Sequence, residues 1–412
     1  MVVVAVILKL LVMLAALAVD VFAFDGIPVW NPLPPRFPAT WALNYSTFFM
    51  PCNYSGAFAL DNSFYAGPGG IVDYDWSNMR SVWSAGRPMD CEERLLEQAV
   101  RTKSKFPHVR TWVYKNIVKA LPWMSDVREK ITDPAYAGWF LRFAFNTTPH
   151  VPTQGSPFYH DQEQTPRGDC GVPCGEYLFD HRNESLREWI IRDYILGKKG
   201  MASGVVDGVF MDDFWSNRSW VLPWSGGDCA TMPTGGPTEV DGHCVQDMGL
   251  DGAQVREIWW QWNLTMQAAM KAVVEQGGYV YQMLNVNAGR DIRDPRAQCT
   301  AWLRDSCRPE SSAFAQPLLF QFSEETSRPL PSPLQDIAQF LLVRGPYAWI
   351  GYSWDGCAPN VPTYERPALL DRDFGVPLEQ CMEVQPGVFR RRWSLATVSL
   401  NCNTWTPSFE FM

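Results

Sequence analysis

Short β-branched and aromatic runs alternate with amphipathic segments along most of this chain. The strand candidates are 69–77, 108–116, 175–183, 205–213, 279–287, 317–325 and 347–356, and the helix candidates are 91–106, 125–133, 184–200, 255–278 and 333–345. This alternation is typical of parallel sheets that are covered by helices. No G-x-G-x-x-G follows a strand candidate, which argues against a dinucleotide-binding fold. The sequence therefore predicts an α/β protein with a (β/α)8 TIM-type barrel.

The end of the chain breaks this alternation. Residues 387–405 (GVFRRRWSLATVSLNCNTW) hold two β-rich runs with no helix between them. They predict a small C-terminal β extension, either completing the barrel or forming an appended β-layer. We therefore expect a leader at 1–23, a barrel at 24–385 and C-terminal β strands at 386–412.

The first 23 residues are largely apolar and end in Val21-Phe22-Ala23, a pattern after which signal peptidase cuts. A signal anchor is the alternative, because no basic side chain precedes the apolar run. No later stretch is apolar for long enough to span a bilayer, so we expect no stable membrane insertion after leader cleavage. The expected location is the extracellular space or an endomembrane lumen, such as the Golgi or the vacuole.

Eleven cysteines and six N-x-S/T sequons also fit an oxidising compartment. Cys170 and Cys174 form a C-x3-C without a second pair, which argues against zinc. We expect local disulfides, first among them Cys229/Cys244, Cys299/Cys307 and Cys357/Cys381, with one thiol left over. N-glycans are expected at the sequon residues Asn44, Asn53, Asn146, Asn183, Asn217 and Asn263.

Charge and motifs narrow the functional classes. A formal net charge of -9 argues against nucleic acid as the main partner. The five histidines include no H-x-H or H-E-x-x-H, and no G-x-S-x-G is present, which disfavours metal hydrolases and serine esterases. We expect no metal and no cofactor.

The segment VVDGVFMDD ends in two adjacent carboxylates, Asp212 and Asp213. In a parallel barrel, the side chains that carry chemistry lie at the carboxyl ends of strands. Neighbouring carboxylates repel, and side chains alternate along a strand, so one should face the barrel mouth and the other a neighbour. A turn or helix cap is the alternative explanation for such aspartates, including Asp75 and Asp180.

The other strand ends are rich in carboxylates, amides and rings, a combination that suits a carbohydrate. We predict a glycoside hydrolase that cleaves O-glycosidic bonds, with Asp212 as nucleophile or general base and Glu324 as general acid. An apolar wall such as Trp215 or Trp354 would raise the pKa of the acid. The predicted substrate-binding residues are Asp213, Asp180, Arg182, Asp75, Trp215, Gln282, Asn285, Gln321, Tyr352 and Trp354.

Two other classes remain open. A non-catalytic carbohydrate-binding barrel would have the same rings but no pair of carboxylates across a cleft. A structural extracellular protein would rely on its disulfides and have no concave pocket.

The segments DGVFMDDFW, FDHRNESLREWII and LVRGPYAWIGYSW resemble secreted glycoside-hydrolase-like barrel proteins of protists and other eukaryotes. The resemblance covers roughly residues 35–405, and GVFRRRWSLATVSLN is similar to the strand pair that follows the barrel in several such families. It implies a (β/α)8 barrel in which Asp212 fills the position after the fourth strand, as in barrels like the α-galactosidases and polygalactosaminidases. It implies no substrate. This chain departs from the pattern at QFSEE, where Glu324 and Glu325 both compete for the place of the second acid.

Overall fold

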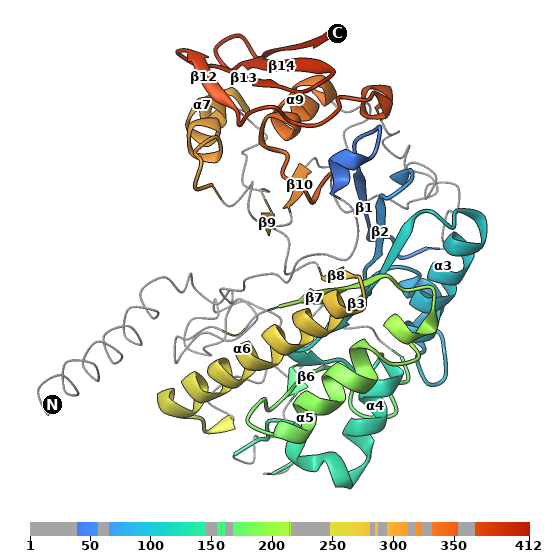
Figure 1. Cartoon of the computed structure of the whole chain (residues 1–412). Coiled ribbons are helices and arrows are strands. Elements are labelled where there is room, and N and C mark those ends of the chain that lie inside the picture. Colours follow the sequence, from blue (N-terminus) through green and yellow to red (C-terminus); the bar gives the residue numbers. More distant parts are fainter. Residues whose placement is uncertain are drawn as a thin grey trace, which may run out of the picture.

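Figure 1 shows a computed structural model of the 412-residue chain. The structure describes residues 39–56, 66–144, 155–157, 159–160, 168–213, 215, 248–280, 285–286, 295–311, 318–322, 332–352 and 367–412. The expected leader lies outside these residues. Among the described residues, no helix is both long and apolar enough to cross a membrane.

The centre of the molecule is a parallel sheet in the order β8-β7-β3-β2-β1-β11-β10-β9. Its strands are β1 (Phe48–Cys52), β2 (Ile71–Tyr74), β3 (Arg110–Asn116), β7 (Gly208–Asp212), β8 (Tyr279–Val280), β9 (Asn285–Val286), β10 (Leu318–Phe322) and β11 (Ala348–Tyr352). The sheet curls, which follows from its own order. In a flat sheet the edge strands β8 and β9 would lie about 34 Å apart, at ~4.8 Å per strand. The chain from Val280 to Asn285 can span at most about 18 Å.

The predicted mixed α/β fold with a curled parallel sheet is therefore present. β11 pairs directly with β1, with Phe48 opposite Ile350. Within the described residues no further strand lies between these two, and a full (β/α)8 barrel is not confirmed.

Helices flank this sheet (Figure 1). They are α2 (Arg80–Trp83), α3 (Cys91–Lys105), α4 (Ser125–Thr132), α5 (Glu184–Trp189), a π-helix (Ile190–Ile195), α6 (Gly252–Glu275), α7 (Pro295–Ser306) and α9 (Pro333–Val343). Short 3-10 turns occupy Thr40–Ala42, Pro134–Trp139, Met201–Ser203 and Ala368–Asp371. The longest helix, α6, begins where the Asp251 carboxylate accepts the N–H groups of Ala253 and Gln254, a capping box.

The expectation that 175–183 is a strand of the central sheet is wrong. β6 (Glu176–Leu178) pairs antiparallel with β4 (Lys119–Ala120) and β5 (Tyr159–His160) in a separate small sheet. β3 instead pairs directly with β7, Asn116 lying opposite Asp212. The apolar pattern of 175–183 identifies a strand but not its partner. The partner is set by β4, which follows β3 almost at once.

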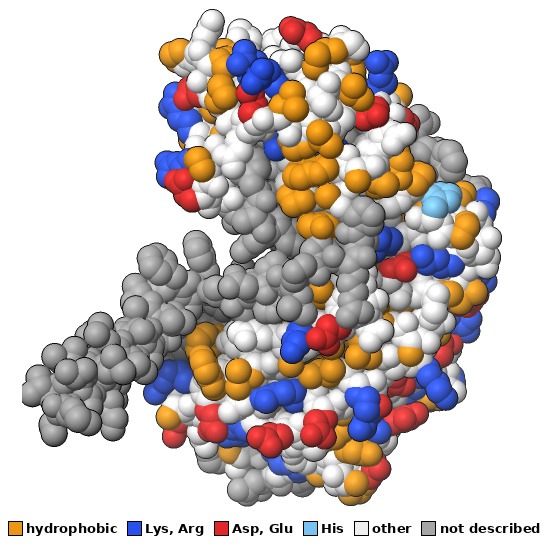
Figure 2. Space-filling view, in the orientation of Figure 1, with side chains coloured by type: hydrophobic (Ala, Val, Ile, Leu, Met, Phe, Trp, Pro, Cys, Tyr) orange, Lys and Arg blue, Asp and Glu red, His pale blue; other side chains and the backbone are white. Residues whose placement is uncertain are grey.

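The last four strands form an antiparallel sheet of their own, in the order β12-β13-β14-β15. They are β12 (Met382–Gln385), β13 (Val388–Arg392), β14 (Ala396–Asn401) and β15 (Thr406–Phe411). One face packs on α9. There the buried Arg391 guanidinium donates a hydrogen bond of 2.7 Å to the backbone carbonyl of Arg344, just after the helix. Apolar side chains also reach the surface of this upper part of the molecule (Figure 2), Met382 and Val384 among them.

Two disulfides fasten this C-terminal sheet to α7: Cys299–Cys402 and Cys307–Cys381. The predicted pairs Cys299/Cys307 and Cys357/Cys381 are therefore wrong, because residues near in space here are far apart in sequence. Cys229/Cys244 lies outside the described residues. Cys91 is a free, buried thiol.

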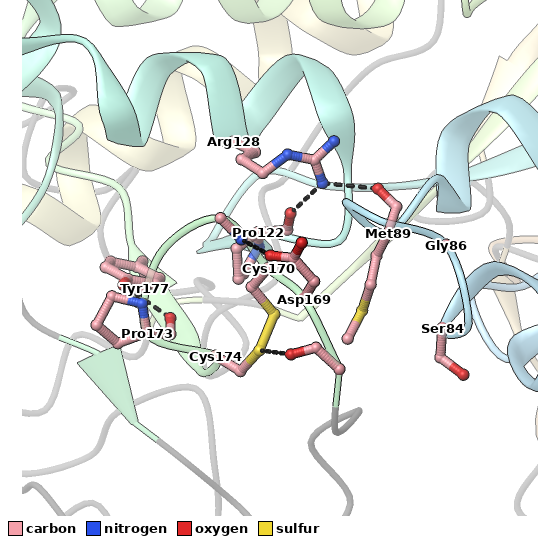
Figure 3. Close-up of a disulfide and its surroundings, with 12 residues drawn as sticks. Ser84, Gly86, Met89, Pro122, Arg128, Asp169, Cys170, Pro173, Cys174 and Tyr177 are labelled. Atoms are coloured by element: carbon pink, nitrogen blue, oxygen red, sulfur yellow. Dashed lines mark hydrogen bonds between the residues drawn. A yellow bond between two sulfur atoms is a disulfide. The ribbon is translucent and has the colours of Figure 1, made fainter.

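Cys170–Cys174 closes the loop that precedes β6 (Figure 3). Asp169 makes two hydrogen bonds in this loop. Its backbone carbonyl accepts from the Met89 N–H at 2.9 Å, and its carboxylate accepts from the Gly171 N–H at 2.9 Å. Arg128 of α4 donates to the Met89 carbonyl at 2.7 Å on the same side. The loop is thus fixed to the α3–α4 region, and it sets the start of β6.

Candidate active site

Contacts on the outer face of the sheet establish which side chains point inward. The Tyr74 hydroxyl of β2 bonds to Thr102 of α3, and Lys115 of β3 pairs with Glu92 of α3. These side chains therefore face the helix layer. Because side chains alternate along a strand, their neighbours Asp73, Tyr114 and Asn116 face the interior of the curled sheet.

Gly208 explains how the interior is filled at the start of β7. A Cβ at this position would lie 2.4 Å from the Trp112 indole and 2.3 Å from the Tyr279 carbonyl, so only glycine fits. Two residues on, the Phe210 ring meets Tyr114 edge-on, with centroids 5.4 Å apart. Continued alternation places Asp212 on this same inward side.

Asp212 is held directly by β3. The Tyr114 hydroxyl donates to its Oδ2 at 3.1 Å. Burial raises the pKa of Asp212 to about 7, and the negative charges of Asp213 and Asp75 act in the same direction. The Asp213 N–H and the Lys119 ammonium oppose this rise in pKa.

Asp213 points elsewhere, because its backbone has a left-handed φ of 60° that ends β7. Its Oδ2 accepts from Asn116 Nδ2 at 2.7 Å and lies 3.1 Å from the Lys119 ammonium. Lys119 also lies 3.0 Å from Glu176 of β6. Burial opposes the charge of Lys119, but Glu176 and Asp213 outweigh it and raise its pKa.

Two more carboxyl groups come from the end of β2. Asp75 accepts from the Ser77 N–H at 2.9 Å and from its hydroxyl at 2.5 Å, yet burial raises the pKa of Asp75 to about 6. Asp73 is fully buried, and neither of its oxygens has a hydrogen-bond partner in the described part of the chain. Burial, with Asp75 and Asp212 nearby, raises the pKa of Asp73 well above its ordinary value.

The structure places four further predicted residues away from this cluster or inside the core. Asp180 follows β6 of the small sheet and forms a local pair with Arg182, at 2.7 and 2.8 Å. The Trp215 side chain is fully buried, as is Tyr352 of β11. A buried ring has no free face on which a sugar could stack.

The other predicted residues lie outside the described part of the chain, or their side chains do. Glu324, Glu325, Gln282 and Trp354 lie outside the described residues. Gln321 and Asn285 belong to β10 and β9, whose strand positions are described but whose side chains there are not.

Four residues around the aspartates were not among the predicted site residues: Tyr114, Asn116 and Lys119, which contact Asp212 or Asp213, and Glu176, which pairs with Lys119. Alternation within 108–116 was a usable signal for Tyr114, since Lys115 and its neighbours must face opposite sides. No signal was available for Lys119 and Glu176, because their meeting depends on the pairing of β4 with β6.

His181 is buried, with Nε2 2.6 Å from the Ile117 carbonyl, and burial lowers the pKa of His181 to about 4. In the part of the chain that is described, no three His, Cys, Asp or Glu side chains are grouped as metal ligands.

The sequons differ in accessibility. Asn44 and Asn53 are exposed, and Asn183 is partly exposed as the N-cap of α5. Asn263 is buried within α6, and its amide donates to the Trp259 carbonyl at 2.9 Å. The folded protein therefore has no room for a glycan at Asn263, contrary to the sequence expectation. Asn146 and Asn217 lie outside the described residues.

The described residues define an α/β protein with inward-facing carboxyl groups at the carboxyl ends of parallel strands. No protein-family model and no curated protein matches the sequence. Among the solved structures that align with most of this chain are three with TM-scores below 0.5. A GH31 dextranase from Flavobacterium johnsoniae, complexed with glucose, has a TM-score of 0.43 at 9% identity over 89% of this chain, which spans only 46% of the dextranase.

Two others are covered more fully. Sucrose 6F-phosphate phosphorylase from Thermoanaerobacter thermosaccharolyticum has a TM-score of 0.42 at 9% identity, over 89% of this chain and 95% of its own. Cyclic alpha-maltosyl-(1-->6)-maltose hydrolase from Arthrobacter globiformis has a TM-score of 0.42 at 12% identity, over 90% of this chain and 86% of its own. At this level of similarity no residue role can be carried over to this chain, and its function must be inferred from its own side chains.

Proposed function

We propose that this protein is a glycoside hydrolase that cleaves O-glycosidic bonds with a pair of carboxyl groups at the mouth of a (β/α)8-type barrel. One observation carries the proposal: Asp212, at the inward-facing end of β7, has a pKa raised to about 7 and carboxyl neighbours from β2. Enzymes that hydrolyse glycosides need two carboxyl groups whose pKa values differ.

In this proposal Asp212 acts in its ionised form, as nucleophile or general base. The hydrogen bond from Tyr114 and the charge of Lys119 both favour that form. Glu324, which follows β10, supplies the general acid, and Asp75 and Asp213 bind or orient substrate hydroxyls. An apolar wall such as Trp215 or Trp354 would raise the pKa of the acid.

The same proposal places the protein in an oxidising compartment, either secreted or in an endomembrane lumen, as a glycoprotein. Three disulfides between described cysteines support this location, since such bonds persist where thiols are not kept reduced. The exposed sequon residues Asn44 and Asn53 are the expected glycan sites.

The test is hydrolysis of a panel of 4-methylumbelliferyl glycosides by the full chain purified from a secretory host. Asp212→Asn should lower kcat by about a thousandfold or more, because the amide can be neither nucleophile nor base. Asp305→Asn is the matched control. Asp305 lies in α7 with its side chain 77% exposed, so this variant should retain the wild-type rate.

Two results would overturn the proposal. Turnover by Asp212→Asn at the wild-type rate would remove Asp212 from the chemistry. Binding of oligosaccharides by calorimetry, without turnover of any glycoside, would instead identify a non-catalytic carbohydrate-binding barrel.

A further inference from the structure

The direction of each hydrogen bond around Asn116 is fixed by its surroundings. Its Oδ1 accepts from two backbone N–H groups, Val118 at 2.9 Å and Lys119 at 2.7 Å. The amide therefore cannot be flipped, since its NH2 group would then meet two donors. Nδ2 must point the other way, where it lies 2.9 Å from Tyr114 Oη and 2.7 Å from Asp213 Oδ2.

This orientation sets the direction of the next bond. Because Asn116 donates to the Tyr114 oxygen, the single hydroxyl proton of Tyr114 is available for its other neighbour, Asp212 Oδ2 at 3.1 Å. The Tyr114 ring is itself held edge-on by Phe210 and is 2% exposed, so the hydroxyl cannot turn to water. A fixed donor thus faces one oxygen of Asp212.

We propose that Tyr114 is a positioning residue for Asp212, a donor whose direction Asn116 imposes and which holds the carboxylate in place and in its ionised form. The inference rests on the proposed function for its role in catalysis, but the hydrogen-bond relationship itself does not require that function. Neither Tyr114 nor Asn116 is among the predicted catalytic or substrate-binding residues.

Four other charged groups interact electrostatically with Asp212. Asp213 is its neighbour in the chain, Asp75 and Asp73 face it from β2, and Lys119 acts from β4. Lys119 also forms an ion pair with Glu176 of β6, which weakens its effect on Asp212. The test must therefore change the Tyr114 donor and leave these groups in place.

Tyr114→Phe does this, because it keeps the ring and removes only the hydroxyl. With the full chain labelled with [γ-13C]aspartate, the Asp212 resonance is assigned by its loss in Asp212→Asn and titrated by NMR. A donor to the ionised carboxyl lowers its pKa, so Tyr114→Phe should raise the Asp212 pKa by about one unit. In the profile of kcat/KM against pH, the acidic limb that Asp212 controls should shift to higher pH by the same amount.

The matched control is Tyr74→Phe, which removes a buried hydroxyl on the helix-facing side of β2 and should leave the Asp212 titration unchanged. As a second probe, 3,5-difluorotyrosine at position 114 supplies a stronger donor and should lower the Asp212 pKa. This variant decides the matter if Tyr114→Phe does not fold.

An Asp212 pKa that moves with neither change overturns the inference. The NMR titration needs no substrate. A wild-type protein without glycosidase activity would therefore contradict the proposed function, while the titration would still decide the role of Tyr114.

Discussion

The Lys115 ammonium lies 2.5 Å from the Glu92 carboxylate, and both side chains are only 1% exposed. This ion pair joins β3 to α3 on the outer side of the sheet. The Tyr194 ring covers Lys115 at 4.1 Å, and the Asp126 N–H donates to Glu92 at 2.7 Å. By fixing Lys115 outward, the pair also fixes Tyr114 and Asn116 inward, where they meet the aspartates.

Lys115→Met should therefore lower the free energy of unfolding by about 3–5 kcal/mol, because it leaves the Glu92 charge buried without its partner. Urea denaturation followed by circular dichroism measures this change. The double variant Lys115→Met/Glu92→Leu should recover much of the loss, since it removes both charges together. Equal losses in the single and double variants would contradict a role for the ion pair.

Local patterns predicted much of this fold. The helical spacing of 91–106 and 255–278 corresponds to α3 and α6, and the strand 205–213 corresponds to β7. Pairing between distant segments could not be predicted in this way. The antiparallel partner of β6 and the Cys299–Cys402 bond both join segments whose own sequences say nothing about each other.

The same limit applies to the candidate site. Alternation along β7 predicted that Asp212 and Asp213 face opposite sides, but the left-handed φ of Asp213 ends the alternation, and both carboxylates accept from interior-facing side chains of β3, Tyr114 and Asn116. The partners of these aspartates were not predictable. Tyr114 reaches Asp212 only because β3 pairs with β7 in this register, and Lys119 reaches Asp213 only because β4 turns back toward β6.

The pH dependence of the reaction should report Asp212. Its pKa is raised to about 7, and the proposed nucleophile or base acts when ionised, so kcat/KM should fall as the pH falls through about 7. The profile is measured with a fluorogenic glycoside between pH 4 and pH 9. Activity that does not fall as the pH drops through about 7 would contradict the ionised role of Asp212.

The raised pKa of Asp212 also has a consequence for stability. The folded protein binds this proton more tightly than the unfolded chain, where the pKa is about 3.8. The stabilisation is complete below about pH 4 and is lost as the pH rises through about 7. Asp212→Asn should therefore unfold at similar urea concentrations to wild type at pH 4, but be more stable by about 4 kcal/mol at pH 8. A difference that does not depend on pH would contradict the raised pKa.

The C-terminal sheet should depend on its two long-range disulfides. Cys307–Cys381 closes a separation of 74 residues and joins α7 to the residue before β12, where Arg304 also pairs with Glu383 at 2.7 Å. In the chain-entropy model, a crosslink over a loop of this length stabilises by about 4 kcal/mol. The double variant Cys307→Ser/Cys381→Ser should thus lower the free energy of unfolding by about 2–5 kcal/mol in urea. Cys170–Cys174 closes a separation of only four residues, so its removal should cost much less. Equal losses from the two double-serine variants would show that loop length does not govern the stabilisation.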